Sequence, residues 1–154
     1  MAVKEILQFG NQTLKKVSKP VKEIDQEILN LIQHMKDTLY STSGIGLAAP
    51  QIGVLKRVIL IDLRDEEEPI ILINPKIIKK IGREEDIEGC LSYPGYEGLV
   101  VRPKKVVVTG EVVEGDIVEY TAEGLLAKAF CHEIDHLDGV LYTDRAKKMY
   151  KLQE

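Results

Sequence analysis

The sequence predicts a single α+β domain over residues 1–154, with antiparallel or mixed β-sheets packed around a central helix. Three observations predict this fold. A long amphipathic helical pattern lies near the N-terminus, β-branched and alternating runs fill the middle of the chain, and a second helical pattern follows them. Strands that are grouped together and then followed by a helix are typical of α+β proteins.

The N-terminal part of the chain is predicted to be helical. Asn11 can cap a short helix over residues 12–17, and Pro20 separates it from the next element. A longer helix is expected from about Asp25 to Thr42, because apolar side chains recur there at helical spacing. These side chains are Ile24, Ile28, Ile32, Met35 and Leu39.

Residues 57–120 are predicted to form strands separated by turn residues. The expected strands are 58–63, 70–73, 76–81, 99–101, 106–109 and 117–120. The second long helix is expected to begin with Thr121 as its cap and to end at Gly139, which suits a left-handed residue. The tail, residues 144–154, is basic, and residues 143–152 are expected to form a short terminal helix.

Composition excludes several classes of function. The net charge is −4, with no broad basic excess, which argues against direct DNA binding. No apolar run reaches the length of a membrane span, and the first residues lack a signal-peptide core, so we expect a cytoplasmic protein without a membrane partner. Cys90 and Cys131 are too few for a disulfide framework, and Cys131 is interpreted as a small buried residue.

The stretch from His132 to His136 is the most informative part of the chain. Residues four apart lie on one face of a helix, so His132 and His136 can point at one divalent cation. Glu133 lies between them and can reach a water bound to that cation. This H-E-x-x-H pattern makes the second long helix a candidate metal-binding helix at the centre of the predicted fold. The alternative is a core helix whose histidines merely face each other.

Two histidines leave a catalytic metal one protein ligand short. Cys90 is the candidate, because a thiolate is a good ligand for a borderline metal and Gly89 lets the backbone approach closely. Without a metal, Cys90 would be an ordinary buried cysteine. Gln51 follows a glycine-rich segment, and its neutral amide can donate hydrogen bonds without competing for the metal.

Three segments together resemble the peptide deformylase family: Gly44–Gln51, Glu88–Ser92 and His132–His136. The resemblance implies an enzyme that removes the formyl group from the N-terminal formyl-methionine of nascent polypeptides and releases formate. It implies that one divalent cation is held by Cys90, His132 and His136. Fe²⁺ is then expected as the native metal, with Zn²⁺, Ni²⁺ or Co²⁺ able to occupy the site.

The resemblance also assigns roles around the reacting group. A water bound to the metal would attack the formyl carbon, with Glu133 as general base and then as proton donor. Gln51 and the backbone N–H of Leu91 would hold the formyl oxygen as negative charge develops on it. A cramped site beside the metal would accept a formyl group and exclude larger acyl groups.

Substrate contacts are expected along the same segments. Ile45, Gly46 and Gly89 would hydrogen-bond the peptide backbone in the manner of an added strand. Ile45 and Leu125 would contact the methionine side chain, together with Ala129 and the carbon chain of Lys128. The alternative is that these residues belong to the core.

Several charged residues surround these motifs. Glu88 and Arg102 are expected to form a supporting ion pair behind Cys90, unless they are unrelated surface charges. Asp135 is interpreted as a helix-surface carboxylate. One departure from the family pattern is Cys131, where glutamine is common.

Two rival functions remain at this point. A zinc endopeptidase would use the same helix but take its third ligand downstream, where the chain offers only carboxylates. A metal-stabilised binding module would need four protein ligands and no spare glutamate. The basic tail raises one further question, since it either contacts the ribosome or is a solvated end.

Overall fold

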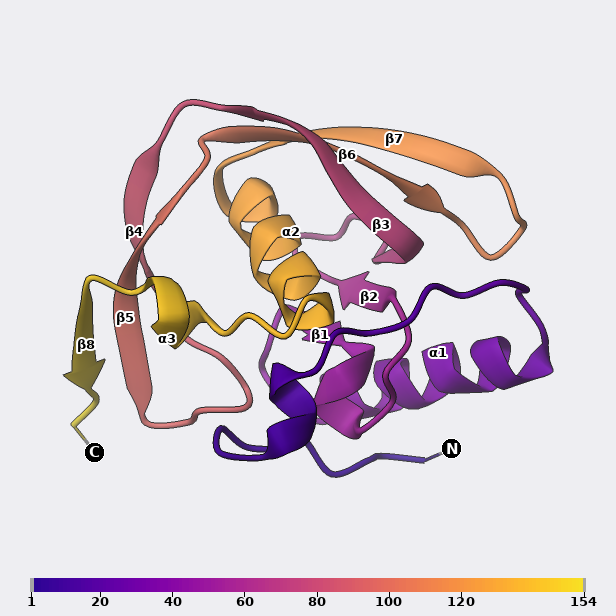
Figure 1. The fold of residues 1–154 in the computed structure, drawn as a ribbon, viewed down its shortest axis with the longest axis horizontal. Helices are drawn as coiled ribbons and strands as arrows, with labels where there is room; N and C mark the ends of the chain where they lie inside the picture. Colours follow the sequence, from indigo (N-terminus) through magenta and orange to yellow (C-terminus); the bar gives the residue numbers. More distant parts are fainter. Residues whose placement is uncertain (1, 154) are drawn as a thin grey trace.

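The computed structural model describes residues 2–153, and two antiparallel sheets enclose a central helix. Figure 1 shows β3, β6 and β7 of the five-stranded sheet passing over helix α2, β1 and β2 below it, and the three-stranded sheet at its side. The strand orders are β1-β2-β3-β6-β7 and β4-β5-β8, and every neighbouring pair of these strands is antiparallel. The predicted α+β class is confirmed.

The elements follow one another in a simple order. They are the 3₁₀ helix η1 (Gln12–Lys15), α1 (Gln26–Tyr40), β1 (Gly46–Ala48), the 3₁₀ helix η2 (Ala49–Ile52), β2 (Val58–Ile61), β3 (Ile70–Ile81), β4 (Glu84–Glu88), β5 (Tyr96–Arg102), β6 (Lys105–Glu111), β7 (Ile117–Glu123), α2 (Gly124–Leu137), α3 (Tyr142–Arg145) and β8 (Lys148–Lys151). Within residues 2–153 no helix is both long and apolar enough to cross a membrane.

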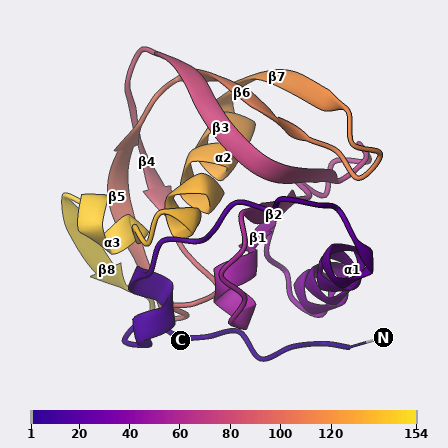
Figure 2. The ribbon, with the colours of Figure 1, turned by 45° about the vertical axis from the view of Figure 1, so that its right-hand side comes forward.

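The two long helices pack on opposite faces of strand β2. Val58 and Leu60 lie in the core cluster that includes α1, whereas Ile59 and Ile61 lie in the cluster that includes α2. This alternation is the period of two expected of a strand that is buried on both faces. Figure 2, in which α1 is seen nearly end-on, shows β1 and β2 between the two helices.

The predicted helix over residues 25–42 is confirmed as α1. Asp25 is its N-cap and accepts a hydrogen bond from the backbone N–H of Ile28. Its buried face carries Leu31 and Thr38 in addition to the predicted Ile28, Ile32, Met35 and Leu39.

The start of α2 differs from the prediction. Thr121 is not its cap, because β7 continues to Glu123, which pairs with Lys105 of β6. The chain turns at Gly124, whose φ is +61°, and Glu123 is the N-cap. Gly139 follows the helix with φ +72°, as predicted, and a side chain there would collide with the carbonyl oxygen of Lys15.

The strands also depart from the prediction: β1 was not expected, and β3 and β4 differ as well. The two strands expected over 70–73 and 76–81 are one strand, β3, with a register shift between Ile73 and Lys76. Asn74 adopts φ +52° at this irregularity, and its side chain donates to the carbonyl oxygen of Val21. Strand β4 was missed because its sequence is mostly acidic and carries little strand propensity.

The predicted terminal helix over residues 143–152 is wrong. Helix α3 ends at Arg145, and β8 then pairs with β5, with Gly98 opposite Met149. Gly98 explains the pairing, because a Cβ atom there would lie 2.7 Å from the sulfur of Met149. The absence of a side chain at Gly98 therefore leaves room for Met149 where β8 pairs with the edge of the sheet.

Candidate active site

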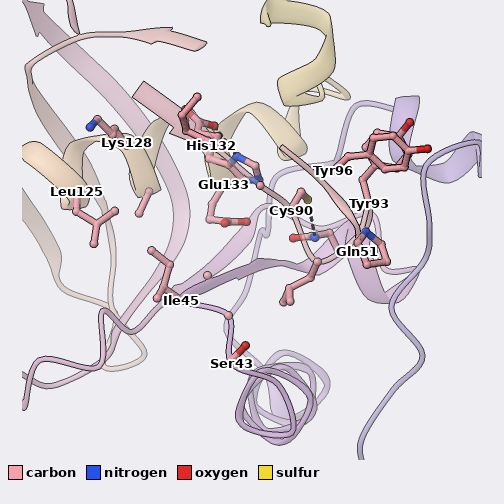
Figure 3. Close-up of a pocket in the computed structure, with 18 of the residues that line it drawn as sticks. Ser43, Ile45, Gln51, Cys90, Tyr93, Tyr96, Leu125, Lys128, His132 and Glu133 are labelled. Carbon is pink, nitrogen blue, oxygen red and sulfur yellow. Dashed lines mark hydrogen bonds and ion pairs between the residues drawn. The ribbon is translucent and has the colours of Figure 1, made fainter. Parts of the chain in front are cut away.

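A cavity of about 450 Å³ opens where β1, the segment after β4 and helix α2 meet (Figure 3). Figure 3 shows Leu125 and Ile45 at one end, His132 and Glu133 in the middle, and Cys90 beside Gln51. The structure places nine of the ten predicted site residues in its wall: Ile45, Gly46, Gln51, Gly89, Cys90, Leu91, Leu125, His132 and Glu133. The tenth, His136, is buried next to Cys90.

The three predicted metal ligands converge. One ligand atom each from Cys90, His132 and His136 lies within 4.8 Å of the others. Cys90 Sγ is 3.4 Å from His136 Nε2, and the two imidazole rings have centroids 5.0 Å apart. The cysteine arrives from the segment after β4, and both histidines come from one face of α2, one turn apart.

The donor atoms suit a divalent cation. His132 Nδ1 donates to Glu88 Oε1 over 2.9 Å, so Nε2 is the ring nitrogen that can serve as a metal ligand. Burial, together with the charges of His132 and Arg102, lowers the pKa of His136 well below its usual value, so its imidazole is neutral. One thiol and two imidazoles form a ligand set for Fe²⁺, Zn²⁺, Ni²⁺ or Co²⁺.

The predicted Glu88–Arg102 ion pair is present and buried. Arg102 donates from Nε and Nη2 to the two oxygens of Glu88, over 2.7 and 2.9 Å. Burial opposes ionisation of Glu88, but the hydrogen bonds from Arg102 and His132 outweigh it and lower its pKa to about 2. An ionised carboxylate therefore orients the His132 ring.

Asp135 belongs to the same network, so it is more than the helix-surface carboxylate that the sequence suggested. It accepts from Arg102 Nη1 over 2.6 Å and from Arg145 Nε over 2.7 Å. Its side chain is 14% exposed. Helical geometry places Asp135 away from the metal ligands, as predicted, but β5 brings Arg102 to that face.

Glu133 stands apart from this network. Its side chain is buried, and Oε1 has no hydrogen-bond partner among the described residues. Burial raises its pKa to about 7, against a lowering effect of His132. Gly46 makes room for it, because a Cβ atom there would lie 2.5 Å from Glu133 Oε2. A carboxyl group of this kind can take up and release a proton near neutral pH.

Gln51 is held with its amide nitrogen toward the metal ligands. The backbone N–H of Ala48 donates to Gln51 Oε1 over 2.9 Å, which fixes the orientation of the amide. Its Nε2 is 3.1 Å from Ser92 Oγ and 3.6 Å from Cys90 Sγ. The 3₁₀ helix η2 thus presents a buried donor beside the thiol.

Leu91 is positioned by a close contact with the glycine-rich segment. A Cβ atom at Gly44 would lie 2.8 Å from Leu91 Cδ1, so the end of the Leu91 side chain packs directly against this glycine. The carbonyl oxygen of Cys90 accepts from the N–H of Tyr93, which forms a turn around Leu91. The backbone of residues 90–93 therefore curves around the cavity next to the thiol.

Among the cavity residues that sequence reasoning did not single out are Tyr93, Tyr96 and Asp86. Tyr93 and Tyr96 line the cavity and stack on each other with ring centroids 4.5 Å apart. Asp86 of β4 lines it as well and forms an ion pair with Lys128 of α2. The contact of Asp86 with Lys128 joins segments that are distant in the sequence, so no local signal identifies it. Tyr93 and Tyr96 lie just after the Glu88–Ser92 motif, and that position is the signal that could have found them.

Two histidines, a cysteine and a buried carboxyl group on one helix-lined cavity define a metal-dependent hydrolase. The family model described as polypeptide deformylase matches residues 3–152. Peptide deformylase 2 of Clostridium perfringens is 53% identical over 156 residues, covering 100% of this chain and 99% of that protein. A peptide deformylase of Carboxydothermus hydrogenoformans is 51% identical over 151 residues, covering 98% of each. The chain therefore belongs to the polypeptide deformylase family.

Solved structures show the same fold. A peptide deformylase from Legionella pneumophila matches with a TM-score of 0.91 and 44% identity, over 95% of this chain and 87% of that one. A peptide deformylase from Synechococcus elongatus, in complex with actinonin, matches with a TM-score of 0.89 and 44% identity. That match covers 93% of this chain and 78% of the other.

Proposed function

We propose that this site removes the formyl group from the N-terminal formyl-methionine of nascent polypeptides and releases formate. The observation that carries the proposal is the buried carboxyl group of Glu133, whose Oε1 has no hydrogen-bond partner within residues 2–153, beside the converging Cys90, His132 and His136. Amide hydrolysis needs a group that accepts a proton from water and then delivers it to the leaving nitrogen. Glu133, with its pKa raised to about 7, suits both steps.

Cys90, His132 and His136 are the proposed metal ligands. The chemistry that a divalent cation supplies at such a site is Lewis acidity, which makes water nucleophilic near neutral pH. We propose Fe²⁺ as the native metal, following the family resemblance, with Zn²⁺, Ni²⁺ or Co²⁺ able to replace it. Metal analysis after anaerobic purification tests this assignment.

Gln51 Nε2 and the backbone N–H of Leu91 are the proposed donors to the formyl oxygen. Gln51 is buried and its amide is oriented by Ala48, so its donor is in place before the substrate arrives. A donor that is oriented in advance stabilises developing negative charge without reorganising, and losing one typically costs about 10²–10³ in rate. Gln51→Ala is therefore expected to lower kcat by that factor.

The substrate backbone is proposed to lie along β1 and Gly89. β1 is an edge strand of the five-stranded sheet, so Ile45 and Gly46 can offer main-chain groups to an added strand. Ile45 and Leu125 lie at the end of the cavity away from Gln51 in Figure 3, where they would contact the methionine side chain. Main-chain recognition of this kind suits an enzyme that acts on many nascent chains.

A cytoplasmic location is part of the proposal, because nascent chains emerge there. We also propose that the basic C-terminal segment contacts the ribosome through Lys148 and Lys151, both exposed on β8. Cosedimentation with ribosomes should weaken in the full chain carrying Lys148→Glu and Lys151→Glu. Equal cosedimentation of this variant and the wild-type protein would refute the contact.

Formate release from formyl-Met-Ala-Ser tests the proposed function. Metal-loaded protein should release formate, chelator should stop the release, and Glu133→Gln should lower kcat by about 10³-fold while keeping its metal. Cys90→Ala should lose the metal, whereas a zinc endopeptidase with a downstream ligand would keep it. Metal-loaded protein that releases no formate from this peptide would refute the function.

A further inference from the structure

Lys128 and Asp86 form an ion pair across the cavity wall, between α2 and β4. Both residues line the cavity. The side chain of Lys128 is only 11% exposed, whereas that of Asp86 is 50% exposed. The backbone N–H of Ile87 donates to Asp86 Oδ1 over 2.8 Å, which holds the carboxylate in place.

Lys128 lies at the end of the cavity proposed for the methionine side chain. It follows Leu125 by three residues on α2, so the two side chains are neighbours on one helix face (Figure 3). Its carbon stem can cover apolar surface while its ammonium group stays with a polar partner. The wall at this end of the cavity is therefore apolar, but the positive charge of Lys128 lies close to it.

Asp86 is the acid that neutralises this charge. Lys128 is the only lysine or arginine in the cavity wall formed by the described residues. The other acids in the wall are Glu88, which binds Arg102 and His132, and Glu133, for which no partner is found in residues 2–153. Removing the Asp86 carboxylate would thus free the ammonium group of a largely buried lysine at the side-chain end of the cavity.

We propose that Asp86 determines specificity by masking Lys128, so that the cavity accepts an uncharged methionine and rejects an acidic side chain of similar length. Glutamate and methionine are both unbranched and similar in length, and charge is the main difference between them. With Asp86 in place, a substrate carboxylate would meet an ammonium group that is already paired, beside a second negative charge. The inference rests on the proposed function.

The test measures the activity of metal-loaded full-length protein on three peptides. Formate release is measured from formyl-Met-Ala-Ser, formyl-Glu-Ala-Ser and formyl-Gln-Ala-Ser, the last as a neutral isostere of glutamate. In Asp86→Asn, the ratio of kcat/KM for the Glu peptide to that for the Met peptide should rise by about tenfold or more. The Gln-to-Met ratio should stay nearly constant, and the gain should shrink at high salt.

Two further variants separate this effect from a general change of charge. Asp86→Asn combined with Lys128→Met should lose the gain, because the freed ammonium group is absent. Glu85→Gln removes a carboxylate from the same strand that is equally exposed, at 50%, but pairs with Lys147 outside the cavity. Its Glu-to-Met ratio should match that of the wild-type protein.

The possible failures are distinguishable. An unchanged Glu-to-Met ratio in both Asp86→Asn and Asp86→Ala, in protein that still acts on the Met peptide, would overturn the inference and leave the proposed function standing. An equal rise in Glu85→Gln would also overturn it. Wild-type protein that is metal-loaded but inactive on the Met peptide would overturn the proposed function and, with it, the role of Asp86.

Discussion

Two groups of ion pairs in this molecule use the same chemistry in different surroundings. Behind the metal ligands, Arg102 is 3% exposed and bridges Glu88 and Asp135. Near the C-terminal segment, Lys15 binds Asp144 with side chains that are 56% and 42% exposed. Water screens the second group and not the first, so the loss of one partner should have very different consequences.

The difference shows where charge positions the active site. In the buried group, Glu88 accepts hydrogen bonds from Arg102 and from the Nδ1–H of His132, so the ion pair directly contacts a proposed metal ligand. In the exposed group, the ion pair only links η1 to α3. Arg145 lies between the two cases, because it is 45% exposed but binds the largely buried Asp135.

Arg102→Ala is expected to have the largest effect on stability. It would leave the buried Glu88 with His132 alone and the largely buried Asp135 with the half-exposed Arg145 alone. Breaking a buried ion pair typically costs about 3–5 kcal/mol. Metal affinity should fall by about 10–100-fold as His132 loses its orientation. Urea unfolding measures the loss of stability, and metal analysis measures the loss of metal. Arg102→Lys should restore only part of the stability and metal affinity, because lysine cannot bind Glu88 with two parallel hydrogen bonds. Wild-type stability and metal content in Arg102→Ala would contradict the role of the buried pair.

The pH dependence of stability should reveal Glu133 as the buried carboxyl group without a cationic partner. Its pKa is about 7 in the folded protein, above the ordinary 4.5, mainly because of burial. Its protonated form therefore contributes stability that is fully present below pH 4.5 and is lost as pH rises through about 7. In metal-free protein, the free energy of unfolding of wild type should fall relative to that of Glu133→Gln between pH 5 and 8. Parallel curves for the two proteins would show that Glu133 is not perturbed.

Arg145→Ala is expected to have an intermediate effect. Asp135 would keep its hydrogen bond to Arg102, so no buried charge is left alone. The loss should be about 1 kcal/mol, at the upper end for exposed pairs. Thermal or urea unfolding measures it, and a loss as large as that of Arg102→Ala would show that exposure does not separate the two arginines.

Lys15→Ala is expected to have the smallest effect, below about 1 kcal/mol. Its partner Asp144 also accepts from the backbone N–H of Leu141, so the carboxylate stays satisfied. The small loss should shrink further in high salt, because both side chains are exposed. A salt-independent loss of several kcal/mol would mean that this pair behaves like the buried one.

Features that depend on local spacing were predictable from the sequence. The apolar period of α1 and the four-residue spacing of His132 and His136 are properties of a short stretch of chain, and both are found in the structure. Cys90 needed more than local spacing, since its candidacy depended on a distant histidine pair that lacks a third ligand and on the ligand chemistry of a thiolate. The missed strand β4 and the wrong terminal helix are segments whose own residues prefer neither state strongly.

By itself, the sequence determined the α+β class, the helix that carries both histidines and the candidate ligand set. Periodicity and residue chemistry are properties of short stretches of chain, so they can be read without the fold. Three contacts were decided only by the tertiary structure. Met149 packs against Gly98, Arg102 bridges Glu88 and Asp135, and Asp86 forms an ion pair with Lys128. The physical reason is that each of these contacts joins different elements. Their energies depend on burial and on the approach of chain segments, which exist only once the sheets have packed around α2.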